Sequence, residues 1–336
     1  MIQVKSSGNV ILVIAGIIII LSALKAASVI VVPILLASFI AIIISPIYSW
    51  LISKNIPAAF ALLAVIGGLI IVFTLVGVLI GASVQGFSDN LPLYESQLKM
   101  QLAALTKTLQ GYGVIKGDLG SLFDPSSLIK YSATVIKGAG SVLTNSFMIT
   151  LIIAFMLLES VSFESKLLRA SGHNSTMVQI NEVFSKIKHY MAIKAVVSLV
   201  TGIVITLFLL AMGLDYAILW GFIVFLLNFI PNIGSILAAV PAVMLAFVQL
   251  GTFGALEIGA IYLFINVLIG SIIEPRLMGS GLGISTLVVF LSLIFWGWLL
   301  GPVGMLLSIP LTISIKIMLY HEPSTRWLAV LMDSNS

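Results

Sequence analysis

Long runs of apolar residues divide the chain and predict membrane-spanning helices. These runs approach or exceed the roughly 18 to 20 residues that cross a hydrocarbon core. Runs such as residues 11–21 do not alternate polar and apolar positions, so they do not fit the strands of a membrane barrel. We therefore predict an all-α polytopic membrane protein with about six full transmembrane helices, at residues 10–24, 29–50, 58–83, 142–158, 195–212 and 253–273.

Two further segments, residues 217–250 and 286–317, are nearly free of charge and are predicted to form broken helical hairpins. As one straight helix the first would be about 51 Å long, against a hydrocarbon core of about 30 Å. Pro231 lies in its middle, and proline removes a backbone donor and blocks the preceding turn. The second segment has Gly301 and Pro302 at the corresponding place. We expect two re-entrant hairpins that enter from opposite faces, with a single crossing of each as the alternative.

Three polar stretches flank the apolar segments. Residues 85–141 carry five lysines and four acidic residues, and they predict a small helical extracytoplasmic insert. The insert is too small for a core of its own, so it must pack against the membrane domain or a neighbouring subunit. Residues 163–194 are rich in lysine, which predicts a cytoplasmic amphipathic connector. The predicted domains are transmembrane helices at 1–84, the insert, a transmembrane helix at 142–162, the connector, a transport core at 195–320 and a cytoplasmic tail at 321–336.

The composition agrees with this pattern. Of the 336 residues 60% are hydrophobic and 8% charged, whereas soluble chains have about 45–50% and about 25%. The net charge of +4 would suggest nucleic acid as a partner of a soluble protein, but in a membrane protein it reflects lysines and arginines on the cytoplasmic side. We expect the lipid bilayer as a partner, no nucleic acid, and both termini in the cytoplasm.

The motifs of enzymes are missing from the sequence. The chain has no cysteine, no H-E-x-x-H, no G-x-S-x-G and no Walker loop, and its histidines have no second ligand at helical spacing. We therefore expect no catalysis, no cofactor and no metal site. A carrier, passive or ion-coupled, and a membrane scaffold remain as functions.

The two broken segments are the pattern typical of a transporter site, because half-helix ends and unwound backbone offer polar groups at mid-bilayer. Such backbone is tolerated only beside protein or a water-filled cavity. An uncharged polyol needs hydrogen-bond partners rather than a countercharge, and amides, a hydroxyl and freed backbone provide them. The candidate residues for binding a small polar solute are Asn228, Pro231, Asn232, Gly234, Ser235, Trp296, Gly301 and Pro302.

Four charged residues are candidates for coupling transport to H+ or Na+: Asp215, Glu257, Glu274 and Arg276. An ionised side chain in a membrane span is costly unless it faces water or a partner. Each candidate also has a structural interpretation. Glu257 can lie at the interface, Glu274 and Arg276 can form a pair that fixes the linker after them, and Asp215 can cap a helix.

Three ordered motifs carry a resemblance to a known family. They are NFIPNIG at residues 228–234, IEPRLMG at 273–279, and FWGWLLGPVGM at 295–305 followed by Ile309 and Pro310. The chain resembles the AI-2E family of bacterial inner-membrane proteins, also called UPF0118, over nearly its whole length. One departure is that Thr286, and not proline, follows Ser285, so the last segment is expected to start less sharply.

The resemblance implies a function and an assembly. It implies export of the quorum-sensing signal autoinducer-2 or a similar small polar solute, or exchange of Na+ or Li+ for protons. It also implies a homo-oligomer, a pentamer in the family's pattern, which would give the insert a neighbour to pack against. A scaffold that transports nothing remains the third hypothesis.

Overall fold

The computed structural model describes residues 7–114, 117, 124–144, 146–171, 174–231, 233–278 and 283–333. Helices account for nearly all of these residues, and the described ranges contain no strand. Five of the helices are long and apolar enough to cross a membrane, and shorter apolar helices accompany them. The predicted class, an all-α polytopic membrane protein, is confirmed.

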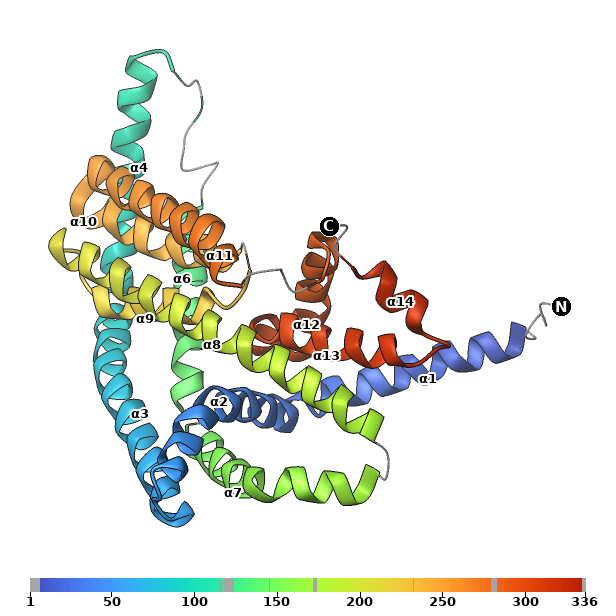
Figure 1. Ribbon diagram of the computed structural model, residues 1–336. Coiled ribbons are helices and arrows are strands. Elements are labelled where there is room, and N and C mark those ends of the chain that lie inside the picture. The colour runs from blue at the N-terminus through green and yellow to red at the C-terminus, as the bar shows by residue number, and fades with distance from the viewer. Residues whose placement is uncertain are drawn as a thin grey trace.

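Figure 1 shows the helices in order along the chain. They are α1 (Ser7–Ala26), α2 (Ser28–Ser53), α3 (Ala58–Asp89), α4 (Leu91–Gly111), α6 (Pro125–Thr144), α7 (Ser146–Ser171), α8 (Asn174–Ala211), α9 (Ala217–Leu227), α10 (Gly234–Ile265), the π-helix η1 (Asn266–Ile273), α11 (Glu274–Met278), α12 (Thr286–Leu306), α13 (Ser308–His321) and α14 (Arg326–Leu331).

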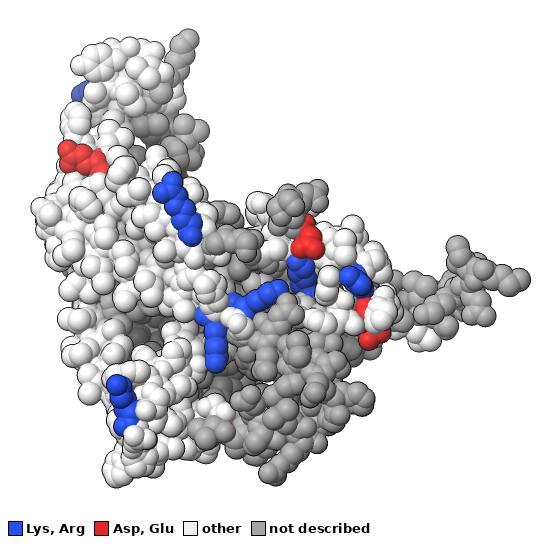
Figure 2. Space-filling view, in the orientation of Figure 1, with Lys and Arg blue, Asp and Glu red and all other residues white. Residues whose placement is uncertain are grey.

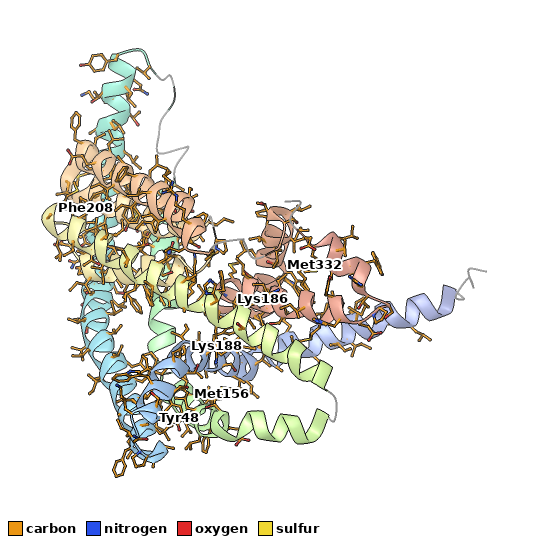
Figure 3. The ribbon with its side chains drawn as sticks, viewed as in Figure 1. Tyr48, Met156, Lys186, Lys188, Phe208 and Met332 are labelled. Atoms are coloured by element: carbon orange, nitrogen blue, oxygen red, sulfur yellow. The ribbon has the colours of Figure 1, made fainter. Side chains whose placement is uncertain are left out.

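The amino-terminal helices form one packed unit with α7. Tyr48 of α2, Ala61 of α3 and Ile153 of α7 are almost fully buried in a shared apolar cluster. Tyr48 and Met156 mark this cluster in Figure 3. The opposite faces of these helices carry large exposed apolar side chains, as expected where lipid replaces water as the solvent. Few charged side chains appear on the face drawn in Figure 2.

Helix α8 runs diagonally across the molecule and contacts both hairpin regions (Figure 1). It packs against α9 through small residues. A side-chain carbon added to Gly221 would lie 1.7 Å from the Thr206 hydroxyl oxygen, and one added to Gly202 would lie 2.7 Å from the Gly221 carbonyl oxygen. The two backbones are therefore in direct contact, which is the close approach that small residues permit between membrane helices.

The insert packs against the first hairpin of the same chain. The Tyr131 hydroxyl of α6 donates to the Leu237 carbonyl of α10 at 3.0 Å. Phe87, at the end of α3, stacks edge-on against Trp220 of α9, with ring centroids 5.6 Å apart, and lies 5.5 Å from the Tyr94 ring of α4. The expectation that the insert needs a supporting surface is met within the chain.

The carboxyl end folds back onto the second hairpin. Lys316 of α13 contacts the Asp333 carboxylate at 2.5 Å and also donates to the Gly283 carbonyl. The Ser285 backbone N–H donates to the Met332 carbonyl at 3.0 Å. The tail that follows α13 is thus tied to the start of α12.

Some boundaries differ from the predicted ones. The fourth span was expected from residue 142, but α6 continues to Thr144 and α7 begins at Ser146. Residues 142–143 are apolar like the span that follows, so hydropathy does not mark the junction. Ser285 is the N-cap residue of α12, and its side chain accepts a hydrogen bond from the Val288 N–H at 3.3 Å. The expectation that this helix starts less sharply than one with proline after the serine stays a prediction.

Candidate functional site

The first broken segment is interrupted where the sequence predicts. Helix α9 ends at Leu227 and α10 begins at Gly234, with turns between them. A side-chain carbon on Gly234 would lie 1.7 Å from the Leu227 carbonyl oxygen, so only glycine allows the chain to reverse this tightly. Pro231 lies half-buried in the turn, and Asn232 lies outside the described residues.

Two hydrogen bonds connect this break to other helices. The Asn228 side-chain amide donates to the Ser198 hydroxyl of α8 at 3.1 Å. The Ser235 hydroxyl donates to the Asn266 side-chain oxygen, at the start of η1, at 2.7 Å. Asn228 is 8% exposed and Ser235 9%, whereas Asn266 is half-buried, so the first pair lies inside the protein and the second is partly buried. The structure thus places two predicted site residues in a polar cluster with Ser198 and Asn266.

A buried ion pair lies at the other end of η1. The Lys194 ammonium of α8 is 2.5 Å from the Glu274 carboxylate. The side chain of Lys194 is 3% exposed and that of Glu274 15%. The charge pattern assigns Lys194 to the exposed connector, but the structure buries it because α8 continues unbroken from the connector into the membrane domain.

Ser198 and Lys194 share one face of α8, since residues four apart in a helix are neighbours. Asn266 and Glu274 lie at the start and just beyond the end of η1. π-Helical turns are rare and occur frequently at functional sites. We name the set Lys194, Ser198, Asn228, Ser235, Asn266 and Glu274 the polar cluster. Sequence reasoning missed Lys194, Ser198 and Asn266, although polar residues four apart in an otherwise apolar span were a signal that could have shown the first two.

The second broken segment is also interrupted where predicted. Gly301 has φ 70° and ψ −156°, a conformation outside the helical region that residues with a side chain rarely adopt, and Pro302 follows it. The Trp296 indole N–H donates to the Thr312 hydroxyl at 3.1 Å, which ties the two arms together. The polar group of Trp296 therefore serves the hairpin itself.

Among the described residues, the regions around the two breaks contact each other only through apolar side chains. Phe229, next to Asn228, packs on a cluster that contains Leu307 and Ile309 just after the second break, together with Tyr190 of α8. The polar cluster lies on the first hairpin, α8 and η1. The structure brings Asn228, Ser235 and Glu274 into one region and leaves Trp296, Gly301 and Pro302 in another.

The remaining ion-coupling candidates lie elsewhere. Glu257 and Arg276 are exposed. Within the described residues Glu274 pairs with Lys194 and not with Arg276, which corrects the predicted pair. Residues 279–282 of the linker lie outside the described residues. Asp215 is not a cap, because Tyr216 is the N-cap residue of α9; the Asp215 carboxylate instead accepts a hydrogen bond from Gln249.

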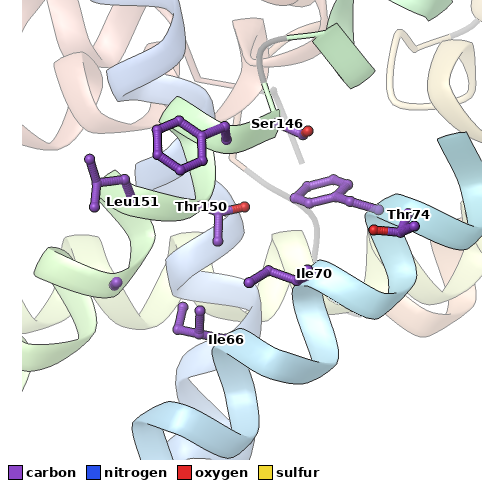
Figure 4. A pocket seen from close by; sticks show the side chains of 9 residues that line it. Ile66, Ile70, Thr74, Ser146, Thr150 and Leu151 are labelled. Atoms are coloured by element: carbon purple, nitrogen blue, oxygen red, sulfur yellow. The ribbon is translucent and has the colours of Figure 1, made fainter.

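A cavity of about 370 Å³ lies between α3 and α7, away from the polar cluster. Figure 4 shows it from close by, with Ile66, Ile70 and Thr74 on α3 facing Thr150 and Leu151 on α7. Its lining is mainly apolar, and Leu151 and Ile70 are exposed on the side of the molecule where lipid is expected. The cavity therefore offers little to a polar solute.

Sequence comparisons identify the family. The sequence model described as AI-2E family transporter matches residues 10–322. This chain belongs to the AI-2E transporter family. It is 36% identical over 328 residues to the AI-2 transport protein TqsA of Escherichia coli (strain K12), covering 97% of this chain and 95% of TqsA.

Two further relatives match nearly as fully. A Haemophilus influenzae protein is 41% identical over 333 residues, 95% of this chain and 94% of the relative. YhhT of Escherichia coli (strain K12) is 34% identical over 332 residues, 98% of this chain and 95% of YhhT. This AI-2E protein is thus a multi-pass bacterial membrane transporter that works in a lipid bilayer on a small solute.

Proposed function

We propose that this AI-2E transporter is a secondary carrier that exports a small, uncharged, polar solute across the bacterial inner membrane, with both termini in the cytoplasm. The observation that carries the proposal is the pair of hydrogen bonds at the first break, the buried one from Asn228 to Ser198 and the partly buried one from Ser235 to Asn266. Each bond joins the hairpin to a different helix, so separating the hairpin from α8 and η1 would free four polar side chains.

The energetics of hydrogen bonding suit such a site. A hydrogen bond exchanged for another contributes only about 0.5–1.5 kcal/mol, whereas a buried group left unpaired costs about 1–3 kcal/mol. A hydroxyl both donates and accepts, so a polyol can satisfy the amides of Asn228 and Asn266 and the hydroxyls of Ser198 and Ser235 once their mutual bonds open. Hydrogen bonds to the solute thus offset the free energy of breaking the protein's own hydrogen bonds when the site opens.

The chemical class of the solute is inferred from the side chains of the polar cluster and from the relative TqsA. Apart from the paired Lys194 and Glu274, the polar cluster is neutral, which favours a neutral ligand over an ion. TqsA is named as an AI-2 transport protein, and we infer an autoinducer-2-like polyol as the solute here. We further propose a homo-oligomer, in keeping with the extensive apolar surface of α1, α3 and α7 in the single chain.

Efflux of autoinducer-2 from vesicles that contain the purified protein tests the proposal. Replacing Asn228 with alanine removes a solute partner and leaves Ser198 unpaired, so we expect the initial rate to fall about tenfold. Ser292→Ala is the control, because among the described residues the buried Ser292 hydroxyl bonds only to the Val289 carbonyl of its own helix, and it should keep the wild-type rate. A folded Asn228→Ala protein with unchanged efflux would contradict the proposal.

A further inference from the structure

The ion pair between Lys194 and Glu274 joins two candidate membrane spans. The two residues belong to the candidate spans Ser185–Ala211 and Gly234–Met278, and their charged atoms are 2.5 Å apart. Of the two side chains, that of Lys194 is almost wholly inaccessible, at 3% exposed. A lone charge at such a place is strongly disfavoured, so each residue depends on the other for its neutralisation.

The pair adjoins the groups that we assign to the solute. Lys194 lies one helical turn before Ser198, and Glu274 follows the π-helix that Asn266 begins. Carriers that use an ion gradient place a protonatable or cation-binding group beside the solute, where the entering ion neutralises it. Here the carboxylate at that place is already neutralised by an ammonium group of the same chain.

No other described cation contacts this carboxylate. Glu274 begins α11, and helices α8 and η1 pack against α11. The other described ionisable side chains of these helices do not face the carboxylate with a positive charge. Tyr190 is buried near Glu274 and carries no positive charge. The basic side chains of the neighbourhood lie at exposed positions: Lys186, Lys188, His189 and Arg276. Figure 3 labels Lys186 and Lys188 along α8.

We propose that Lys194 is an internal counter-ion that takes the place of a coupling cation, so that the carrier moves an uncharged solute without Na+, Li+ or H+. The inference rests on the proposed function and specifies it: Lys194 is the residue that makes transport of the solute independent of cations. Without the ammonium group, Glu274 would require a cation from solution, and the protein would acquire a cation site it otherwise lacks.

The test uses the purified full-length protein in lipid nanodiscs at alkaline pH, with NaCl or LiCl compared with choline chloride. We expect the wild-type Tm to be the same in the three salts. The Tm of Lys194→Met should rise with the concentration of Na+ or Li+, by about 2 °C for each tenfold increase above the Kd. Lys194→Met combined with Glu274→Gln should lose that response. Lys99→Met is the control, since Lys99 pairs with Glu95 on the exposed face of α4.

Each outcome decides the question. A Lys194→Met protein that is folded and indifferent to Na+ and Li+ overturns the proposal, as does a wild-type Tm or efflux rate that requires either ion. If Lys194→Met does not fold in choline chloride, recovery in NaCl supports the counter-ion role and failure in both salts overturns it. A wild-type protein that moves no polyol would refute the proposed function alone, because the Tm response is measured without solute.

Discussion

The first hairpin is broken between Leu227 and Gly234, whereas the second is broken at one residue, Gly301. At the first break Asn228 and Ser235 bond to other helices. At the second, the indole of Trp296 bonds to Thr312 within the same hairpin, and the carboxyl-terminal tail binds its base through Lys316. The same conflict between segment length and bilayer thickness thus yields one hairpin whose break is hydrogen-bonded to neighbouring helices and one whose indole hydrogen bond stays within the hairpin.

The largest effect is expected from a change at the turn of the first hairpin. Gly234→Ala would place a side-chain carbon 1.7 Å from the Leu227 carbonyl oxygen, and because that oxygen belongs to the backbone, the two backbone segments would have to move apart. We predict a loss of stability of about 3 kcal/mol or more, seen as a lower Tm and a low yield of folded protein.

Gly259→Ala, in the part of α10 beyond the kink at Gly251, is the control for that change. Its added carbon would meet only the Val243 side chain at 3.9 Å, an ordinary contact, so its stability should stay within about 1 kcal/mol of wild type. Equal stability of the two variants would refute the tight first turn.

A smaller effect is expected at the second hairpin. Trp296→Phe removes the hydrogen bond to Thr312 and keeps the aromatic ring, so we predict a loss of about 1 kcal/mol in stability with efflux unchanged. The measurement is Tm in detergent together with vesicle efflux, run beside Asn228→Ala. If Trp296→Phe reduced efflux as strongly as Asn228→Ala, the two hairpins would not differ in function as proposed.

The smallest effect is a pH dependence of the insert, which packs on the first hairpin. Hydrogen bonds from Lys99 and Ser126 lower the pKa of the Glu95 carboxyl below its ordinary value. A carboxyl with a depressed folded pKa stabilises the fold above its unfolded pKa, and the contribution is lost as the pH falls through the folded pKa.

We therefore predict that Tm declines as the pH is lowered below about 4.3, the ordinary glutamate pKa, and that Glu95→Gln reduces the slope of that decline. Glu257→Gln is the comparison, since the exposed Glu257 has no ion-pair partner among the described residues. Identical slopes for wild type and Glu95→Gln would show that the Lys99 and Ser126 contacts do not stabilise the ionised carboxyl.

The breaks could be predicted from sequence and their partners could not. An uncharged segment far longer than the bilayer is thick, with Pro231 or Gly301 in its middle, cannot be one straight helix. The partners could not be predicted, because Ser198 lies 30 residues from Asn228 in the sequence and Lys194 lies 80 residues from Glu274. The packing of α8 against the hairpin and η1 brings these pairs together, and the hydropathy pattern does not predict that packing.

Two features of the local backbone also could not be predicted from the sequence. Residues 266–273 are as apolar as an ordinary span, and nothing in their sequence marks a π-helix. The junction of α6 and α7 is equally hidden, since apolar residues lie on both sides of it.

The most direct test of the central claim is water access to Ser198, which is fully buried in the structure. The chain has no cysteine, so Ser198→Cys gives a single reactive site for a water-soluble maleimide in membranes. If the first hairpin parts from α8 during transport, Ser198→Cys is labelled slowly, and saturating polyol protects it. A Ser198→Cys protein that stays unlabelled under all conditions, while the exposed Ser324→Cys reacts fully, would contradict a solute path at the first hairpin.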